Sequence, residues 1–137
     1  GAAPSETGKP SAIETLGISG PEEKAWDQMS FDEREFYMIG KVLPIMAEIF
    51  GQYTAEYAAF EDVQCETCHG DDMREIECAM PAPSLPAVPP VGTSEYTAMR
   101  EEHGEMVKFM EQTVTPTMAK LLGKDGYSCA GCHPEPE

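Results

Sequence analysis

The first long run of apolar positions at helical spacing extends from Phe31 to Gly51. Ser30 and Glu33 stand just ahead of it at the spacing of a capping box, which predicts a helix that begins near Phe31. Gly51 follows the last apolar residue and predicts the C-terminal cap. Pro44 lies inside this helix, where it removes one backbone hydrogen bond and should bend the chain.

A second run of the same kind predicts a helix from about Glu95 to Leu122, with Pro116 inside it and Gly123 as its cap. A short helix is expected over residues 21–28, which open on a proline and two glutamates. No segment shows the two-residue alternation of a strand. The pattern predicts an all-α fold with little or no strand.

The two long helices belong to an internal repeat. A shift of 72 residues aligns YMIGKVLPIMAEIFG, residues 37–51, with FMEQTVTPTMAKLLG, residues 109–123. Methionine, valine, proline, alanine and glycine recur at matching places. We predict two pseudo-repeated modules, each a helix, a loop and a cysteine motif, over about residues 31–70 and 95–133.

Each module ends in a CxxCH motif, the signature of covalent haem c attachment. Two thiols three residues apart add to the two vinyl groups of one haem, and the adjacent imidazole binds the iron. The motifs predict two haem c groups, attached through Cys65, Cys68, Cys129 and Cys132, with His69 and His133 as iron ligands.

Two other kinds of site use paired cysteines. The knuckles of a zinc ribbon usually stand about 15–20 residues apart, whereas 60 residues separate Cys68 from Cys129. A thioredoxin-like motif needs a strand before it and a helix after it. Neither setting is present, so haem c is the prediction for both motifs.

The sixth iron ligand of the second haem has to come from upstream, because only four residues follow His133. A methionine at helical spacing is more often core than ligand, and the chain has nine. Those that recur in the repeat stand out: Met46 with Met118, then Met38 with Met110. Met80 is a third candidate for the first haem. His103 would give one haem two imidazoles, although the repeat places Phe31 at its equivalent position. Methionine ligation raises a haem's reduction potential relative to a second histidine.

The chain resembles two repeats of the tetrahaem cytochrome subunit of photosynthetic reaction centres, in which a helix with the axial methionine precedes each CxxCH. The resemblance covers about residues 31–70 and 95–133. It implies an electron-transfer protein located outside the cytoplasmic membrane, in the periplasm or on an outer surface. Carried over residue by residue, it implies the axial pairs His69 with Met46 and His133 with Met118.

The rest of the chain completes one domain over residues 21–137. Residues 1–20 are rich in glycine, alanine, proline and serine, have no signal-peptide core, and are expected to form a flexible tether of the kind that follows a lipid anchor. Residues 79–94 hold five prolines and should form an extended crossover between the modules. Cys78, between Ile76 and Met80, is expected to be a buried, inert thiol.

The net charge of −16 makes nucleic acid an unsuitable partner and favours redox proteins with a basic docking face. No segment has the about 20 apolar residues of a transmembrane helix. We predict a dihaem cytochrome c that carries single electrons and is no enzyme. The alternative is a dihaem peroxidase, reductase or gas sensor, which needs an open or displaceable sixth position at one iron.

Overall fold

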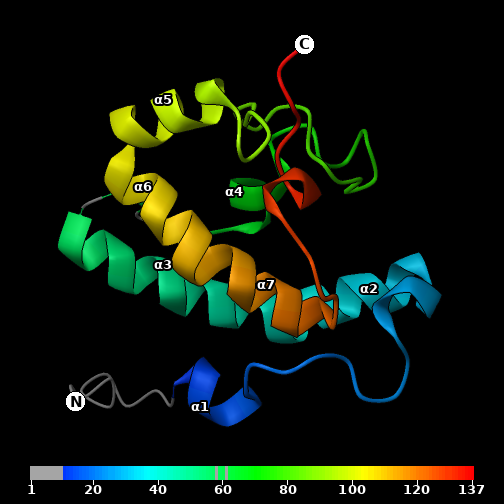
Figure 1. The fold of residues 1–137 in the computed structure, drawn as a ribbon. Helices are drawn as coiled ribbons and strands as arrows, with labels where there is room; N and C mark the ends of the chain where they lie inside the picture. Colours follow the sequence, from blue (N-terminus) through cyan, green and yellow to red (C-terminus); the bar gives the residue numbers. More distant parts are fainter. Residues whose placement is uncertain (1–10, 58, 61) are drawn as a thin grey trace. The chain divides into compact units, whose positions relative to one another are not determined.

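The computed structural model describes residues 11–57, 59–60 and 62–137, and the chain divides into two compact units. The first unit consists of Gly1–Asp62 with Lys120–Lys124, and the second of Val63–Ala119 with Asp125–Glu137. The described residues form helices and turns and contain no strand (Figure 1). The predicted all-α fold is confirmed. None of the described helices is both long and apolar enough to cross a membrane.

The first unit is built around one long helical run that begins where the sequence predicts. Ser30 caps it: its hydroxyl accepts from the Glu33 N–H at 3.2 Å, and the Glu33 carboxylate accepts from the Ser30 N–H at 2.7 Å. The elements of this unit are α1 (Ala12–Leu16), the 3₁₀ turn η2 (Trp26–Gln28), α2 (Phe31–Tyr37), the π-helical turn η3 (Met38–Val42), α3 (Leu43–Tyr57) and the end of α7 (Thr115–Leu122).

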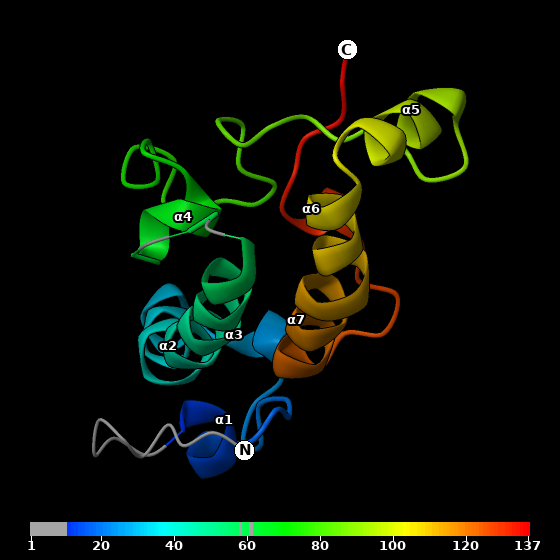
Figure 2. The same cartoon turned by 90° about the vertical axis from the view of Figure 1, so that its left-hand side faces the viewer.

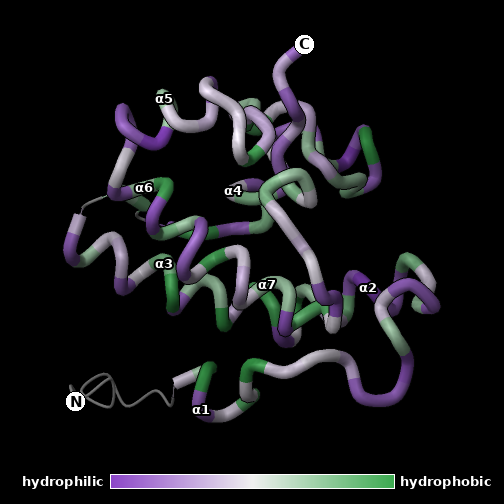
Figure 3. The backbone as a smooth tube through the Cα atoms, in the orientation of Figure 1, coloured by the Kyte–Doolittle hydropathy of each residue, from purple (hydrophilic) through white to green (hydrophobic). Residues whose placement is uncertain are grey.

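The core of this unit is a stripe of buried side chains along α3, three or four residues apart, which appears as recurring apolar bands in Figure 3. Its members are Val42, Ile45, Met46, Ile49, Phe50 and Tyr53. The start of helix α1 is hydrogen-bonded to α3 through the Glu48 carboxylate, which accepts from the Ser11 hydroxyl at 2.5 Å and from the Ala12 N–H at 2.8 Å. The tether expected over residues 1–20 lies outside the described residues up to position 10, and residues 12–16 of it form α1.

The prediction that the first helix ends at Gly51 is wrong. Helix α3 continues through Gly51 to Tyr57, because aromatic packing beyond the glycine outweighs its low helix propensity. The Tyr53 ring is buried and lies 4.7 Å from that of Tyr57 and 6.2 Å from that of Phe60. Tyr53 thus extends the buried stripe beyond the glycine, and its contact with the exposed Tyr57 supports the last turn.

The short helix expected over residues 21–28 is also wrong in extent, since only the turn Trp26–Gln28 forms. The glutamates at its start are exposed and bury no apolar face. Trp26 packs instead on α2: the Arg34 guanidinium lies 4.9 Å from its ring, and the Tyr37 ring lies 6.0 Å away. The segment is held by this anchor rather than by helical hydrogen bonds.

The second unit contains both cysteine motifs. Its elements are α4 (Cys65–His69), α5 (Ser94–Glu102), α6 (Gly104–Phe109), the π-helical turn η4 (Met110–Val114), the first five residues of α7 and the 3₁₀ turn η5 (Cys129–Gly131). The single helix predicted from Glu95 to Leu122 is wrong in one respect: it breaks at His103, where φ is −120° and ψ 43°, and α5 turns into α6 (Figures 1 and 2). The break lets the Tyr96 hydroxyl of α5 donate to the Glu111 carboxylate.

Each proline inside a long helix is preceded by a π-helical turn, and the two turns, Met38–Val42 and Met110–Val114, stand 72 residues apart in sequence. The Leu43 N–H donates to the Met38 carbonyl, five residues back, and the Thr115 N–H does the same to Met110. A proline ring clashes with the carbonyl four residues before it. The extra residue in each turn lets the helix run past its proline.

Candidate functional site

The first cysteine motif forms a helix of its own, α4, which consists of the five residues CETCH. The Gln64 N–H donates to the Thr67 hydroxyl at 3.0 Å, and the Thr67 N–H donates to the Gln64 carbonyl at 3.0 Å, so the first turn is closed. Residues three and four apart share one face of a helix. Cys65, Cys68 and His69 therefore stand on the same side of α4.

Gly70 ends α4 in a backbone conformation that other residues avoid, with φ 86° and ψ 162°. A Cβ at this position would overlap the Ser84 hydroxyl oxygen, which donates to the Asp72 carboxylate at 3.1 Å. Only glycine fits here. The chain thus turns sharply away directly after His69.

The second motif is a tighter turn. The Cys132 N–H and the His133 N–H both donate to the Cys129 carbonyl, at 3.1 and 2.9 Å. A Cβ on Gly131 would lie 2.6 Å from a carbon of the Tyr127 ring, and the Tyr127 hydroxyl lies 3.2 Å from the Cys132 sulfur. The ring is therefore seated against the motif, where a side chain at position 131 would displace it.

The proline-rich crossover runs along this second motif. The Ala82 N–H donates to the Cys132 carbonyl at 2.9 Å, and the Val88 N–H donates to the Pro134 carbonyl at 2.8 Å. A hollow of about 210 Å³ lies between the two segments, beside Cys129. Residues 79–93 contain neither helix nor strand, as predicted. Two of their backbone N–H groups donate hydrogen bonds to carbonyl groups in or directly after the second motif.

The His133 imidazole is held by this crossover. Its Nδ1 lies 2.8 Å from the Pro86 carbonyl oxygen. A carbonyl oxygen only accepts, so Nδ1 carries the proton and the lone pair is on Nε2. Histidines that bind a metal through one nitrogen usually donate from the other to a carbonyl or carboxylate. His133 has the tautomer and the support of such a ligand.

His69 differs from His133 in its surroundings. Its Nδ1 is buried without a hydrogen-bond partner in the described part of the chain. Burial lowers the pKa of the imidazole, since the charged form loses solvation. A neutral ring is the form that binds a metal. A buried and unpaired ring nitrogen is unusual, which keeps His69 a candidate ligand.

All five cysteines are free thiols. Burial, followed by the nearby Cys132 and Cys65, raises the pKa of Cys68 to about 11. Burial also raises the pKa values of Cys129 and Cys132. These thiols are protonated at neutral pH. Two pairs of thiols, each followed by an imidazole, fit the donor set that haem c attachment requires.

The candidates for the sixth iron ligand lie in different surroundings. Met46 is buried in the core of the first unit, whereas His69 belongs to the second. Met118 is half-buried in α7 and shares the second unit with His133. The remaining candidates are Met38 and Met110, each the first residue of a π-helical turn, the half-buried Met80 and the exposed His103. The axial pairings of Met46 and Met118 stay predictions.

Three residues of the site were missed by reasoning from sequence. They are Pro86, Tyr127 and Ser84, which contact His133, Cys132 and Asp72. The glycines inside or after the motifs were the available signal for close packing, and the prolines were a signal for an extended segment beside them.

Within the described ranges, no group of three or more His, Cys, Asp or Glu side chains has the arrangement of a metal site. No protein-family model, curated protein or solved structure matches this chain.

Proposed function

We propose that this chain is a dihaem cytochrome c that carries single electrons between redox proteins outside the cytoplasmic membrane. Cys65 and Cys68 would hold one haem and Cys129 and Cys132 the other. His69 and His133 would be the proximal iron ligands. Two complete CxxCH motifs in 137 residues support two haems.

The observation that carries this proposal is the hydrogen bond from His133 Nδ1 to the Pro86 carbonyl. It fixes the tautomer, leaves Nε2 free to bind iron, and sets the plane of the ring before any haem is attached. The 47 residues between the two positions make this a tertiary contact.

Each residue of the site has a separate task in this proposal. Bound haem would supply a one-electron iron couple whose potential its axial ligands set. The paired thiols tether the ring edge, and the histidines orient and hold the iron. The crossover would hold the His133 ring through the Pro86 carbonyl. One-electron transfer through the iron would need no proton transfer by the protein.

Mass and visible spectra of the protein, expressed with a haem c maturation system, test the proposal. The expected result is a mass increase of two haems and intense Soret and α bands. The variant H133A should keep its thioethers but lose the six-coordinate spectrum at one haem, and C129A/C132A should lose one haem entirely. The matched control is C78A, which removes the one thiol outside both motifs and should keep both haems.

A zinc-loaded protein without visible bands would refute the proposal. The enzyme or sensor alternative has its own readout. Rapid stoichiometric binding of carbon monoxide to one haem of the reduced protein would indicate an open sixth position there. Slow or absent binding at both haems is the result expected of an electron carrier.

A further inference from the structure

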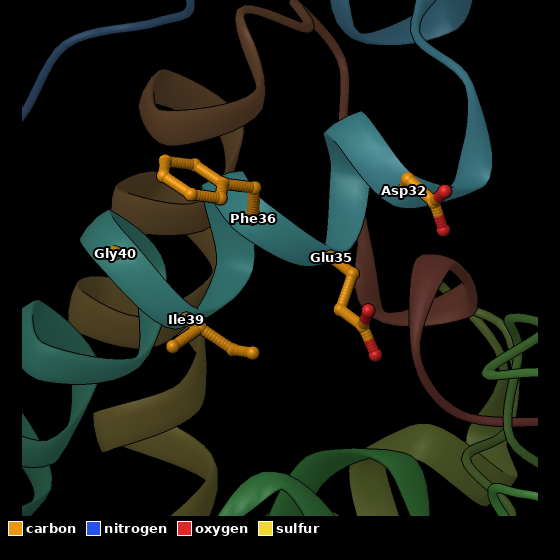
Figure 4. A pocket seen from close by; sticks show the side chains of 5 residues that line it. All are labelled: Asp32, Glu35, Phe36, Ile39 and Gly40. Atoms are coloured by element: carbon orange, nitrogen blue, oxygen red, sulfur yellow. The ribbon is translucent and has the colours of Figure 1, made fainter.

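Helix α2 and the start of η3 expose an apolar face in the first unit. The Phe36 side chain is 81 % exposed and that of Ile39 57 %. Both project from the same helical run as Asp32, Glu35 and Gly40 (Figure 4). These five residues, here called the α2 face, line an open hollow of about 350 Å³. Contiguous exposed apolar side chains rimmed by polar residues are typical of interaction sites.

The internal repeat shows that the helix itself does not require them. The shift of 72 residues places Lys108 at the position of Phe36 and Glu111 at that of Ile39. The second copy nevertheless forms the same succession of α-helix, π-helical turn and α-helix. Phe36 and Ile39 therefore serve something other than the helical module.

The second copy also shows what lies on the equivalent face. There α5 contacts one residue of it, the Ile39 equivalent: Tyr96, 4 % exposed, donates its hydroxyl to Glu111, and Arg100 lies 3.6 Å from the same carboxylate. Lys108, the Phe36 equivalent, is exposed. An aromatic side chain and a cation from one helix thus contact a single carboxylate of η4. The second copy supplies this helix from its own sequence.

In the first copy the segment before α2 packs elsewhere. Trp26 contacts Arg34 and Tyr37, which are about half a helical turn away from Phe36 and Ile39. The residue that α5 contacts in the second copy corresponds to Ile39 in the first, and Ile39 is exposed there together with Phe36.

Charge indicates which kind of helix would fit. Asp32 and Glu35 border the apolar pair, and neither has an ion-pair partner in the described part of the chain. The net charge of −16 opposes a second copy of the chain, whose own α2 face would bring the same two carboxylates together. A helix with lysine or arginine beside an apolar stripe would instead be attracted.

We propose that the α2 face docks an amphipathic basic helix of a partner protein. Phe36 and Ile39 enter the apolar stripe of that helix, and Asp32 and Glu35 pair with its flanking cations, as Glu111 does with Arg100 of α5. The inference extends the proposed function by naming a docking face. It does not depend on haem attachment, because its test measures binding alone.

The test uses two synthetic 18-residue helices with the same leucine stripe, one flanked by lysine and the other by glutamate. Binding to the full purified chain is measured by calorimetry and mapped by ¹H–¹⁵N NMR. The decisive variant is F36K/I39E, which introduces the residues of the second copy and leaves the net charge unchanged. The control is V91N, which removes another exposed apolar side chain, 70 % exposed, in the second unit.

The lysine helix should bind the wild-type chain and V91N with equal affinity, and the NMR shift changes should centre on residues 32–40. Its affinity for F36K/I39E should be at least tenfold lower. D32N/E35Q should weaken binding and flatten its dependence on salt. Equal binding to F36K/I39E, or shifts centred elsewhere, would show only general attraction to an acidic protein and overturn the proposal. So would a wild-type dimer that F36K/I39E dissociates, or equal binding of the glutamate helix.

Discussion

Gly51 and Gly123 occupy the same place in the two repeats, yet alanine should change stability in opposite directions at the two positions. Gly51 lies inside α3, and no atom comes within 4 Å of the place that a Cβ would take. Alanine there should stabilise the fold by about 0.5–1 kcal/mol, because it restricts the unfolded chain and favours the helix.

Gly123 follows the last residue of α7 with φ 68°. Its N–H donates to the Lys120 carbonyl at 3.2 Å. A Cβ would meet Pro21 at 3.5 Å, an ordinary contact, so the cost is that of the left-handed backbone alone. Alanine should therefore destabilise the fold by about 1–2 kcal/mol.

The assay is urea unfolding of G51A and G123A, followed by far-ultraviolet circular dichroism, with the slope of each transition compared with that of the wild type. Both residues belong to the first unit, so one transition reports on both. The midpoint urea concentration should rise for G51A and fall for G123A, and in a parallel thermal melt the midpoint temperature should shift in the same directions by about 4 °C per kcal/mol. Destabilisation by G51A would show that the helix ends at the glycine and refute the extension of α3 to Tyr57.

Four further outcomes are expected. M118H and M46H should each lower the reduction potential of one haem in spectropotentiometry; unchanged potentials and an unchanged near-infrared methionine band would exclude these ligands. G131A should lose about 1–3 kcal/mol because its Cβ crowds the Tyr127 ring, and the loss should shrink in a Y127A background; an undiminished loss would exclude the ring as its cause. Y37F should lower the free energy of unfolding by about 1 kcal/mol at neutral pH, because it removes the hydrogen bond to the Leu121 carbonyl. F36Y, at an exposed neighbouring position, is the control, and a loss for Y37F smaller than that for F36Y would contradict this reasoning. Burial raises the pKa of Tyr37, so the folded protein should lose stability as the pH rises past about 10; Y37F should lose less, as measured by unfolding at pH 7 and pH 11.

Features that depend on neighbours in sequence were predictable. The capping box of Ser30 and Glu33 forms as the spacing indicates, because both partners lie within one turn. Gly123 takes the positive φ of a helix end. The prolines marked two irregular places in the long helices, although the π-helical turns ahead of Pro44 and Pro116 were not foreseen. Each turn depends on local sterics that periodicity does not report.

Features that depend on distant partners were not predictable. The rings of Tyr53 and Tyr57 carry α3 past Gly51, and the bond from Tyr96 to Glu111 accompanies the break at His103. Glycine and apolar spacing describe a helix by itself. They carry no information about which other segment it buries.

The sequence by itself determined the chemistry of this protein: two CxxCH motifs, their thiols and imidazoles, and the repeat that pairs each with a methionine-bearing helix. The proposed haem attachment would need only residues within one turn, so local order is sufficient for it. The tertiary structure decided which imidazole nitrogen is free, through the Pro86 carbonyl 47 residues from His133. It also decided that Phe36 and Ile39 stay exposed, because exposure depends on what the rest of the chain covers.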